Sequence, residues 1–382
     1  MELVVYSPLS FRYGGGFEKS FLRSLTRLRE LGIRSTIFCT DFLAGDAQRL
    51  TFEKVASYLE QANSTYVELK QTTLGQIPIP HASSLAELAR TVRDADVVYW
   101  NNAYALHDII GSAISHLGTP VISGYHAALF SAHFAHNQYV RWVTLPLASS
   151  FTASHVLNSD DARTLRRWTP KRVYLIPPGI DTTRFRSAAS SRDSGNTFKV
   201  LFVGRLVEQK GIGILAEVIR MAKTHGYESK IQFTIAGSGP LAYLLKEIAE
   251  SVSNVRVVGH VNEPSLQTLY GSSDLLIMPS LRETFGNVAL EALACRLPVL
   301  AFSISGLRDY ITDGVEGILV NNKQTDELFK SLEKMFVKWK ERREDFTRMR
   351  EAAHKQALRF DLTTTTSRFA SMVREVSGEK SA

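Results

Sequence analysis

The stretch 198-FKVLFVGRLVEQKGIGILAEVIRMAKTHGYESKIQFTIAGSG-239 determines the fold class. Its two apolar runs, FKVLFVGR and IQFTIAGSG, are short and end in glycine-containing turns, which is typical of buried strands. Between them, GIGILAEVIRMAKTHG repeats its apolar residues at helical spacing. A strand, a helix and a second strand in this order predict two parallel strands joined by a crossover helix.

The same alternation continues in both directions along the chain. Downstream it passes through DLLIMPS, LPVLAF and GILV, and upstream through ELVVYS, STIFCT, DADVVYW, PVISGYH and RVYLIPPG. One upstream helix, FEKSFLRSLTRLRELG, places Phe21, Leu25, Leu28 and Leu31 at helical spacing and stops at Gly32. The chain is therefore predicted to be α/β, with two facing Rossmann-like domains and a cleft between them.

The domain boundaries follow from composition. Residues 1–182 form the expected N-terminal domain, and 183–196 are a linker, because they are rich in Ser, Arg, Asp and Gly and have no periodicity. Residues 197–361 form the C-terminal domain. A last helix is expected from about 362 to 382, and the family resemblance given below implies that it packs back on the N-terminal domain.

Charge and composition exclude several classes of protein. The net charge is +7 over 382 residues, but both signs are interspersed and no basic arm of the nucleic-acid-binding type is present. Three explanations of the positive charge remain open: a solvated basic surface, an anionic small substrate and an anionic membrane face. Cys39 and Cys295 lack metal-ligand spacing, which suits a reducing compartment. No secretory signal is recognised at the N-terminus, and the apolar region 142–153 is too short to span a bilayer, so a cytoplasmic location is expected.

The segment 201-LFVGRLVEQKG-211 predicts an anion site. Arg205 directly follows a strand, Gly204 permits close approach, and Lys210 opens the next helix. Two cations beside a helix N-terminus suit a diphosphate. A solvated loop would explain either cation alone, but the position at a strand end favours the site.

Two glycine-rich turns are weaker signals. In 235-IAGSGP-240 the third glycine of a dinucleotide fingerprint is missing, so a tight turn is the simpler interpretation. The run 14-GGG-16 follows a strand, and Asp41 ends the next one, but this run also lacks the spaced third glycine. Glycines that admit backbone amides to a phosphate remain the simpler functional account here.

The segment 281-LRETFGNVALEALACRLPVLAF-302 holds two carboxylates around a helix start. Residues 284–287 supply consecutive backbone amides, which form an anion site. Glu283 is expected to project outward just before the helix, and Glu291 to reach back along it. Carboxylates beside a phosphate site are favourable when they accept hydrogen bonds from paired hydroxyls, so one is predicted to bind a sugar and the other a ribose.

These motifs together resemble the retaining glycosyltransferases of family 4, which have the GT-B fold. The resemblance rests on GGGFEKS, IPPGIDTTRF, VGRLVEQKG, IAGSGP, VRVVGHV and MPSLRETFGNVALEALACRLPVLAF. It covers nearly the whole chain, and residues 200–320 most specifically. It implies transfer of a hexose-type sugar from a nucleotide diphosphate sugar, UDP- or GDP-linked, with the anomeric configuration kept, and no further cofactor.

The resemblance also implies roles for individual residues. Arg205 and Lys210 hold the donor diphosphate, Glu283 faces the donor sugar, and Glu291 binds the ribose. His126, in 123-SGYHAALF-130, lies on the acceptor side of the cleft, although a structural strand-end histidine is the alternative. The other implied donor contacts are Gly15, Gly16, Val261, Phe285, Gly286, Asn287 and Val288, and Glu208 has an uncertain role.

The sequence departs from the family at three places. Pro178-Gly179 stands where Asn-Gly is usual, Arg296 replaces a usual glycine, and Asp309 replaces a usual glutamate. The first is expected to be structural, whereas the other two are expected near the cleft mouth, where they would affect donor selectivity. No metal site is expected, because the only Asp-x-Asp, Asp94 and Asp96, opens a buried strand and is better explained as a cap.

Two other functions share these features. A nonhydrolysing nucleotide-sugar 2-epimerase has the same architecture and donors but needs no acceptor, and a non-catalytic nucleotide-sugar-binding module needs only the donor site. For a transferase, the basic segment 163-RTLRRWTPKR-172, with Trp168 among its cations, indicates a lipid or lipid-linked glycan acceptor and peripheral binding to an anionic membrane face. A solvated helix end is the alternative explanation of this segment.

Overall fold

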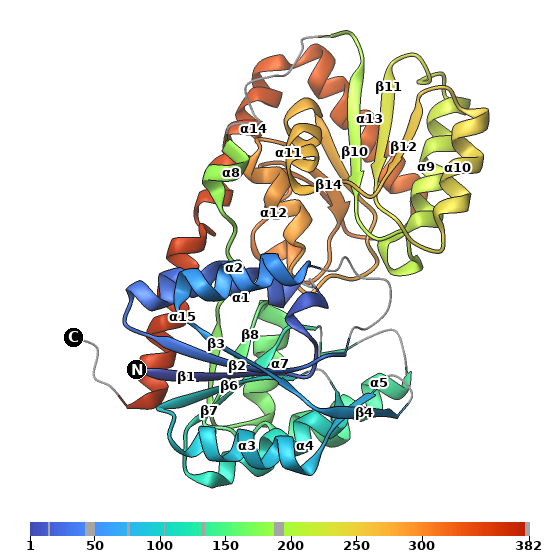
Figure 1. The fold of residues 1–382 in the computed structure, drawn as a ribbon. Helices are drawn as coiled ribbons and strands as arrows, with labels where there is room; N and C mark the ends of the chain where they lie inside the picture. The colour runs from blue at the N-terminus through green and yellow to red at the C-terminus, as the bar shows by residue number, and fades with distance from the viewer. Residues whose placement is uncertain are drawn as a thin grey trace. The chain divides into compact units, whose positions relative to one another are not determined.

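The computed structural model describes residues 1–13, 16–42, 50–74, 77–102, 104–127, 129–130, 134–186 and 195–378. The chain divides into two compact units. The first contains Met1–Gly179 and Leu362–Ala382, and the second contains Ile180–Asp361. Each unit has its own sheet, which the ribbon in Figure 1 shows with helices on both faces.

The first unit is built on a seven-stranded parallel sheet with the order β3-β2-β1-β6-β7-β8-β9. Its strands are β1 (Glu2–Ser7), β2 (Arg34–Thr40), β3 (Thr65–Leu69), β6 (Val97–Asn102), β7 (Val121–Tyr125), β8 (Ala153–Val156) and β9 (Arg172–Leu175). A separate antiparallel hairpin joins β4 (Gln71–Leu74) to β5 (Ile77–Pro80). The helices are α1 (Gly16–Glu30), α2 (Phe52–Ala62), α3 (Ala82–Arg93), α4 (Ala105–Ile114), α5 (Phe134–Tyr139), a π-helix at Val140–Thr144, α6 (Leu145–Leu147), α7 (Ser159–Trp168) and α15 (Leu362–Ser377).

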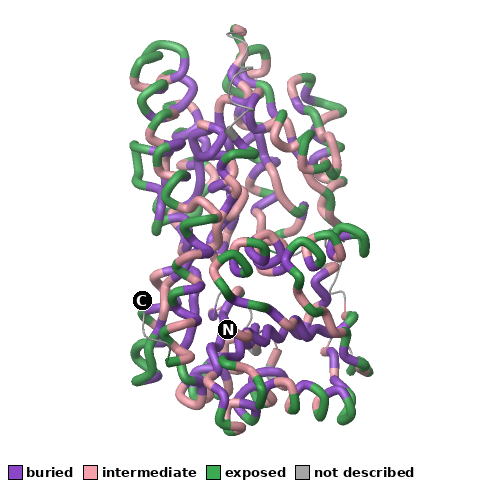
Figure 2. Tube along the Cα trace, turned by 60° about the vertical axis from the view of Figure 1, so that its left-hand side comes forward, coloured by how far each residue is buried: buried purple, intermediate pink, exposed green. Residues whose placement is uncertain are grey.

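Alternation along the strands divides the core of this unit between the two faces of its sheet. Leu3 and Val5 of β1 belong to a cluster with buried residues of α1, α2 and α15, whereas Val4 and Tyr6 belong to a cluster with residues of α3 and α4. This is the period-two pattern of a sheet covered on both faces. Figure 2 shows the buried residues concentrated along the strands of each unit.

The second unit has a six-stranded parallel sheet with the order β12-β11-β10-β13-β14-β15. Its strands are β10 (Phe198–Val203), β11 (Ile231–Ala236), β12 (Val255–Gly259), β13 (Leu275–Met278), β14 (Val299–Phe302) and β15 (Gly317–Val320). Its helices are α8 (Thr182–Arg186), α9 (Ile212–Thr224), α10 (Ala242–Ser251), α11 (Glu263–Ser272), α12 (Asn287–Ala294), α13 (Thr325–Glu341) and α14 (Arg343–Leu358). Figure 1 shows α9 and α10 on one side of this sheet and α11, α12 and α14 on the other.

The α/β prediction is confirmed, and every strand named in the sequence analysis is present. Strands β3 and β8 and the β4–β5 hairpin were missed. Strand β5 of the hairpin has prolines at positions 78 and 80, and β8 carries Ser154 and His155 inside the sheet. Neither segment therefore has the pattern of an apolar strand. The predicted linker begins inside α8, and residues 187–194 lie outside the described residues.

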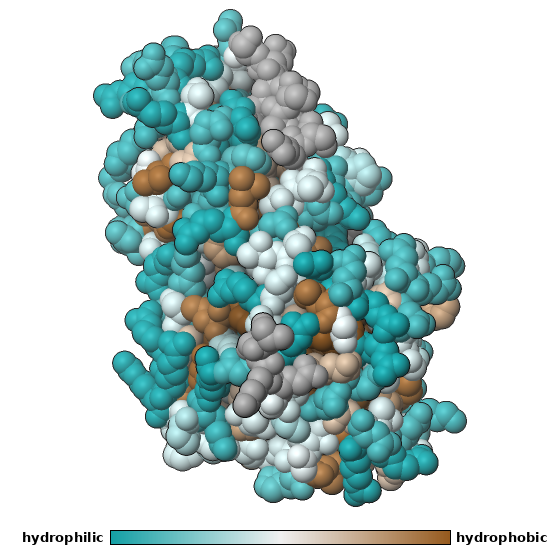
Figure 3. Space-filling model, turned by 90° about the vertical axis from the view of Figure 1, so that its left-hand side faces the viewer, coloured by the Kyte–Doolittle hydropathy of each residue, from teal (hydrophilic) through white to brown (hydrophobic). Residues whose placement is uncertain are grey.

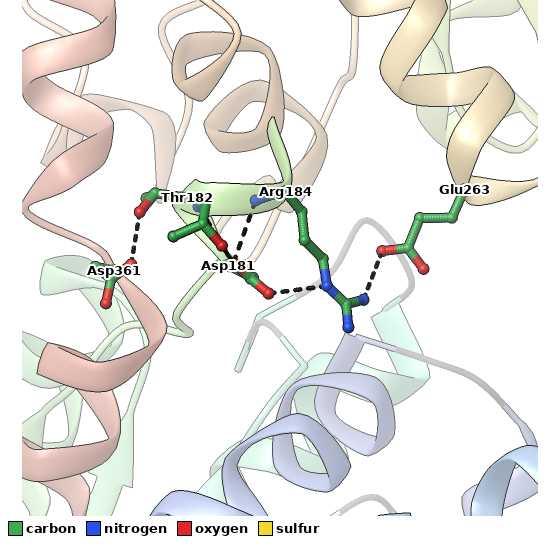
Figure 4. Close-up of polar contacts among 6 residues, drawn as sticks. Asp181, Thr182, Arg184, Glu263 and Asp361 are labelled. Atoms are coloured by element: carbon green, nitrogen blue, oxygen red, sulfur yellow. Dashed lines mark hydrogen bonds and ion pairs between the residues drawn. The ribbon is translucent and has the colours of Figure 1, made fainter. Parts of the chain in front are cut away.

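The chain passes from one unit to the other at 179/180 and again at 361/362, and the second-unit ends of the two crossings are bonded together. Ile180 N donates to the carbonyl of Phe360 over 3.0 Å, and the Thr182 hydroxyl donates to Asp361 over 2.6 Å. Figure 4 shows the bond between Thr182 and Asp361 beside α8. Asp181 caps the first turn of α8, and Arg184 bridges Asp181 and Glu263. The entry to the second unit and the exit from it are therefore fixed to each other.

The face shown in Figure 3 is mostly hydrophilic, with scattered hydrophobic side chains. No helix among the described residues is long and apolar enough to cross a membrane.

Candidate functional site

The predicted anion site lies where the strand order of the second sheet reverses. β10 pairs with β11 on one side and with β13 on the other, so the connections after β10 and β13 leave in opposite directions. In open α/β sheets, ligands bind at the carboxyl ends of the strands at such a switch point. Arg205 and Lys210 follow β10, and Glu283 follows β13.

Backbone contacts bring these two loops side by side. The N–H of Leu281 donates to the carbonyl of Gln209 over 2.9 Å, and the Gln209 side chain donates to the carbonyl of Arg282 over 3.3 Å. Gly211 has φ +69°, and a Cβ placed on it would lie 2.0 Å from the carbonyl oxygen of Pro279. Only glycine fits this close approach at a left-handed residue, so the sequence Lys210-Gly211 fixes the lysine next to the β13 loop.

Lys210 and Glu283 form an ion pair, with 2.5 Å between Nζ and Oε1. The two side chains are only 16% and 10% exposed. The Glu283 carboxylate is therefore buried beside a lysine that neutralises its charge. Its expected projection into the cleft stays a prediction. Arg205 is exposed, and among the described residues it has no carboxylate within ion-pair distance.

The turn before α12 is held from a neighbouring 3₁₀ segment. Gly286 has φ +91° and forms the N-cap of α12. The Tyr310 hydroxyl donates to the carbonyls of Phe285 and Gly286, over 3.2 and 2.9 Å. Burial raises the pKa of Tyr310 well above its usual value, and the charges of Glu283, Asp309 and Glu291 raise it further. One neutral phenol therefore orients the turn within electrostatic range of both predicted carboxylates.

Glu291 is held by a second buried tyrosine. The Tyr270 hydroxyl of α11 donates to Oε2 of Glu291 over 2.9 Å. Burial and the carboxylate raise the pKa of Tyr270 well above its usual value, so it remains a donor. Val261, the predicted base contact, lies between β12 and α11. Asn287 and Val288 are the first two residues of α12.

The departure at Arg296 has a structural explanation. Arg296 lies just beyond the C-terminus of α12, at the opposite end of the helix from Gly286, and has φ +57°. A glycine suits this left-handed conformation best, but here the arginine forms an ion pair with Glu351 of α14 over 2.5 Å. Arg296 is therefore fixed at the C-terminal end of α12, whereas Asp309 lies in the 3₁₀ segment Leu307–Asp309, next to Tyr310. Their expected position near the cleft mouth stays a prediction.

His126 directly follows β7 in the first unit and is partly exposed. Its Nε2 lies 2.6 Å from the Tyr99 hydroxyl, and its ring centroid lies 4.1 Å from that of Phe17 in the first turn of α1. Burial, and secondarily the neighbouring His155, lower its pKa well below the usual value, so the ring is neutral at pH 7. Gly16 begins α1, and Gly15 lies outside the described residues.

Four residues of these sites were not predicted: Tyr270, Tyr310, Tyr99 and His155. Each tyrosine is buried in an apolar environment, and nothing in the local pattern distinguishes its hydroxyl from core packing. His155 was missed together with its strand. The local sequence around His155 does not show that this histidine is buried in a strand. Its burial is explained only by its partners, Tyr99 of another strand and the carbonyl of Ile176.

Within the described residues, no group of three or more His, Cys, Asp or Glu side chains is arranged to hold a metal ion. Asp96 accepts a hydrogen bond from the N–H of Glu2 over 2.6 Å, and Asp94 is the C-cap residue of α3. The Asp96 carboxylate therefore acts at the entry to β6, whereas Asp94 caps α3 through its backbone N–H.

Two family sequence models match the chain in succession. The model described as "Glycosyltransferase Family 4" matches residues 14–184, and the model described as "Glycosyl transferases group 1" matches residues 184–356. Together they account for both units.

Curated relatives match mainly over part of their length. A D-inositol 3-phosphate glycosyltransferase of Arthrobacter sp. (strain FB24) is 35% identical over 175 residues, which are 43% of this chain and 42% of that protein. An uncharacterized glycosyltransferase of Methanocaldococcus jannaschii is 35% identical over 37% of this chain and 36% of its own length. The D-inositol 3-phosphate glycosyltransferase of Thermobispora bispora is 29% identical over 60% of this chain and 56% of its own length.

Solved structures match over the whole chain. Anabaena HepE in complex with UDP-glucose has a TM-score of 0.73 at 20% identity, and covers 98% of this chain and 100% of its own. A sucrose-phosphate synthase from Thermosynechococcus elongatus has a TM-score of 0.75 at 17% identity over 100% of both chains. At these identities the likeness concerns the fold.

Proposed function

Since this chain belongs to the family 4 glycosyltransferases and has the GT-B fold, we propose that it transfers a sugar from a nucleotide diphosphate sugar to an acceptor. The observation that carries the proposal is the grouping of Arg205, Lys210 and Glu283 at the switch point of the second sheet. Two cations and a carboxylate at one strand edge suit a ligand that combines a diphosphate with a hydroxyl-rich sugar.

Each side chain has a role in this proposal. Arg205 and Lys210 bind the diphosphate and stabilise the charge that develops on it as the sugar leaves. The backbone amides at the start of α12 add to this electrostatic stabilisation, because they point out of the helix N-terminus. Glu283 accepts hydrogen bonds from the donor sugar, and Glu291, oriented by Tyr270, accepts them from the ribose.

The donor is a UDP- or GDP-linked hexose. Structural neighbours bind UDP and UDP-glucose, which favours UDP as the first nucleotide to test. In the reaction, the bond between the anomeric carbon and the phosphate oxygen breaks and a bond to the acceptor oxygen forms. The acceptor proton passes to the leaving phosphate, and attack on the same face retains the anomeric configuration.

Product analysis tests this proposal. The protein is incubated with UDP-glucose, or with other UDP- and GDP-sugars, in the presence and absence of candidate acceptors. Transfer predicts acceptor-dependent release of nucleotide diphosphate and a product whose anomeric configuration, read from the proton coupling constant at C1, equals that of the donor. An epimer formed without acceptor would identify a nucleotide-sugar 2-epimerase, and binding without turnover of any donor would identify a binding module.

We also propose that the acceptor is a lipid or lipid-linked glycan, reached at an anionic membrane face. The predicted basic segment retains only part of its charge. Arg163 is paired with Asp160 and Arg172 with Glu375, and Arg166 donates to the carbonyl of Val173 over 3.3 Å. Arg167 and Lys171 are exposed and, in the part of the chain that the structure describes, have no carboxylate within ion-pair distance; Trp168 is 49% exposed.

Two free cations correspond to about 2 kcal/mol of attraction to an anionic leaflet, at roughly 1 kcal/mol each. Cosedimentation with vesicles that contain anionic lipid, at low ionic strength, should therefore be weak but measurable, and should disappear in the double variant Arg167→Glu and Lys171→Glu. The matched control is Arg163→Gln, which removes a cation that Asp160 already neutralises. Wild-type protein that remains in the supernatant would favour a soluble acceptor.

A further inference from the structure

Three polar side chains of the first unit form a hydrogen-bonded chain that ends on a backbone carbonyl. The Tyr99 hydroxyl lies 2.6 Å from Nε2 of His126 and 2.6 Å from Nδ1 of His155. Nε2 of His155 lies 2.7 Å from the carbonyl oxygen of Ile176. Tyr99 is in β6, His126 follows β7 and His155 is in β8, so the chain of bonds crosses three adjacent strands.

The carbonyl sets the direction of every bond in this chain. A carbonyl oxygen only accepts hydrogen bonds, so Nε2 of His155 carries a proton and donates a hydrogen bond to the carbonyl of Ile176. Burial lowers the pKa of His155 to about 4, so the ring is neutral at pH 7 and its Nδ1 is an acceptor. The Tyr99 hydroxyl therefore donates to His155. Its oxygen then accepts from His126, whose proton must reside on Nε2.

This direction determines which atom of His126 can act on a ligand. A neutral imidazole carries one proton, so a proton on Nε2 leaves Nδ1 as a hydrogen-bond acceptor. Among the described residues, no donor lies within hydrogen-bond distance of this Nδ1. The ring therefore has an accepting nitrogen that the described residues of the first unit do not use.

The residues packed around the chain of bonds confine the Tyr99 hydroxyl and contact both histidine rings. A Cβ placed on Gly124 of β7 would lie 2.2 Å from the Tyr99 hydroxyl oxygen, so the glycine provides the space that the hydroxyl occupies. The Phe369 ring of α15 packs edge-on against the rings of Tyr99 and His155, with 5.1 and 5.9 Å between the ring centroids. Phe17 covers the His126 ring.

We propose that Tyr99 and His155 are positioning residues that hold His126 in the tautomer protonated on Nε2, so that its Nδ1 accepts a hydrogen bond from a hydroxyl group of the sugar substrate. The proposal rests on the proposed function for the identity of the substrate, but not for the tautomer. It makes His126 an acceptor toward the ligand and not a proton donor.

The tautomer can be measured without any substrate. In protein labelled with ¹⁵N-histidine, long-range proton–nitrogen correlation spectra distinguish a protonated ring nitrogen from an unprotonated one. The His126 signals are those missing from the spectrum of His126→Gln. We expect a protonated Nε2 and an unprotonated Nδ1 at pH 7, and a protonated Nδ1 in the wild type would overturn the proposal.

Two variants test the direction of the chain. In His155→Leu, the Tyr99 hydroxyl loses its acceptor and can donate to Nε2 of His126, so the His126 proton should move to Nδ1. In Tyr99→Phe, both partners of the hydroxyl are lost and His126 should populate both tautomers. An unchanged His126 tautomer in both variants would show that these residues do not set it.

The first unit contains a matched control. Tyr6 is also fully buried, and its hydroxyl lies 2.5 Å from Nδ1 of His107, whose Nε2 lies 2.8 Å from the carbonyl oxygen of Pro78. Tyr6→Phe therefore removes an equivalent buried hydrogen bond on the neighbouring strand without touching His126. Its His126 spectrum should match that of the wild type, which separates the proposed effect from a general loss of stability.

Kinetics complete the test. Tyr99→Phe should lower kcat about tenfold, the effect of one weakened hydrogen bond, with UDP affinity unchanged within about twofold, whereas Tyr6→Phe should leave both unchanged. Equal rates in Tyr99→Phe and wild type would overturn the role toward substrate. If the wild type transfers no sugar at all, the proposed function fails, while the spectra still decide the tautomer.

Discussion

Replacing Glu283 by Gln should strengthen the binding of UDP, although it removes a predicted donor-site residue. The Lys210 ammonium is paired with this carboxylate over 2.5 Å, so a diphosphate must compete with Glu283 for it. Side-chain exposures of 16% and 10% place the pair between exposed pairs, which contribute about 0–1 kcal/mol, and fully buried ones, whose disruption costs about 3–5 kcal/mol. A competing interaction of about 1–2 kcal/mol corresponds to a roughly 5- to 30-fold lower Kd for UDP.

Isothermal titration calorimetry with UDP measures this directly, in low-salt buffer at pH 7. Lys210→Met provides the opposite change and should weaken UDP binding by at least about tenfold, since it removes one charge-assisted hydrogen bond. Glu208→Gln is the matched control for net charge. Glu208 lies in the same loop as Lys210 but is exposed, and solvent screens its charge. Neutralising it should therefore change the Kd for UDP by less than about twofold.

Turnover of the sugar donor separates the two roles of the carboxylate. Glu283→Gln should bind UDP more tightly and yet turn over the donor more slowly, because the sugar loses a charged acceptor. If Glu283→Gln binds UDP as weakly as Lys210→Met does, the carboxylate supports the diphosphate site and does not compete with it, and the reasoning from the ion pair is refuted.

Arg205→Ala should lower kcat by roughly two to three orders of magnitude, as expected on loss of a charge-stabilising donor, and near-full turnover would remove Arg205 from the site. Activity should survive EDTA within about twofold, and complete loss that magnesium or manganese restores would refute a metal-free mechanism. The urea concentration at the unfolding midpoint should decrease as the pH is lowered from 7 to 5. Burial lowers the pKa of His107 and of His155 to about 4, whereas histidine in the unfolded chain has a pKa near 6.5. The unfolded chain therefore binds more protons than the folded one in this range, and acidification favours unfolding. Each histidine lowers the free energy of unfolding by about 1.4 kcal/mol per pH unit below about pH 6. Burial raises the pKa of Asp108 to about 6, so this group gains a proton in the folded state and offsets one of the two histidines. A midpoint that rises on acidification would contradict this account.

Local patterns were sufficient for most of the strands and helices that form the two sheets and their covering layers. The apolar runs at β10 and β13 are mostly buried in a parallel sheet, and such runs are visible in sequence because nearly every side chain is apolar. Strand β8 was missed for the opposite reason. Ser154 and His155 are buried there, and His155 is stable inside the sheet because a tyrosine from another strand and a carbonyl pair with it.

In the candidate site, too, the local features could be predicted from sequence and the long-range contacts could not. Gly211 and Gly286 could be placed at helix starts from sequence, and both are N-cap residues with positive φ. The burial of Glu283 could not be predicted, because its partner Lys210 is 73 positions away and only the pairing of β10 with β13 brings the two loops together. The roles of Tyr270 and Tyr310 depend on contacts of the same long-range kind.

The return of α15 to the first unit has a consequence for synthesis on the ribosome. Ala370, Met372 and Val373 are buried in the same core cluster as Leu3 and Val5, so the sheet that contains β1 cannot be fully covered until α15 has been made. The second unit is continuous in sequence and needs no later segment. At roughly 5–20 residues per second, translation of that unit takes about 10–40 s, during which one face of the nascent sheet remains partly bare. We therefore expect the unit made second to reach its native state first, and the nascent N-terminal half to be the part that chaperones bind.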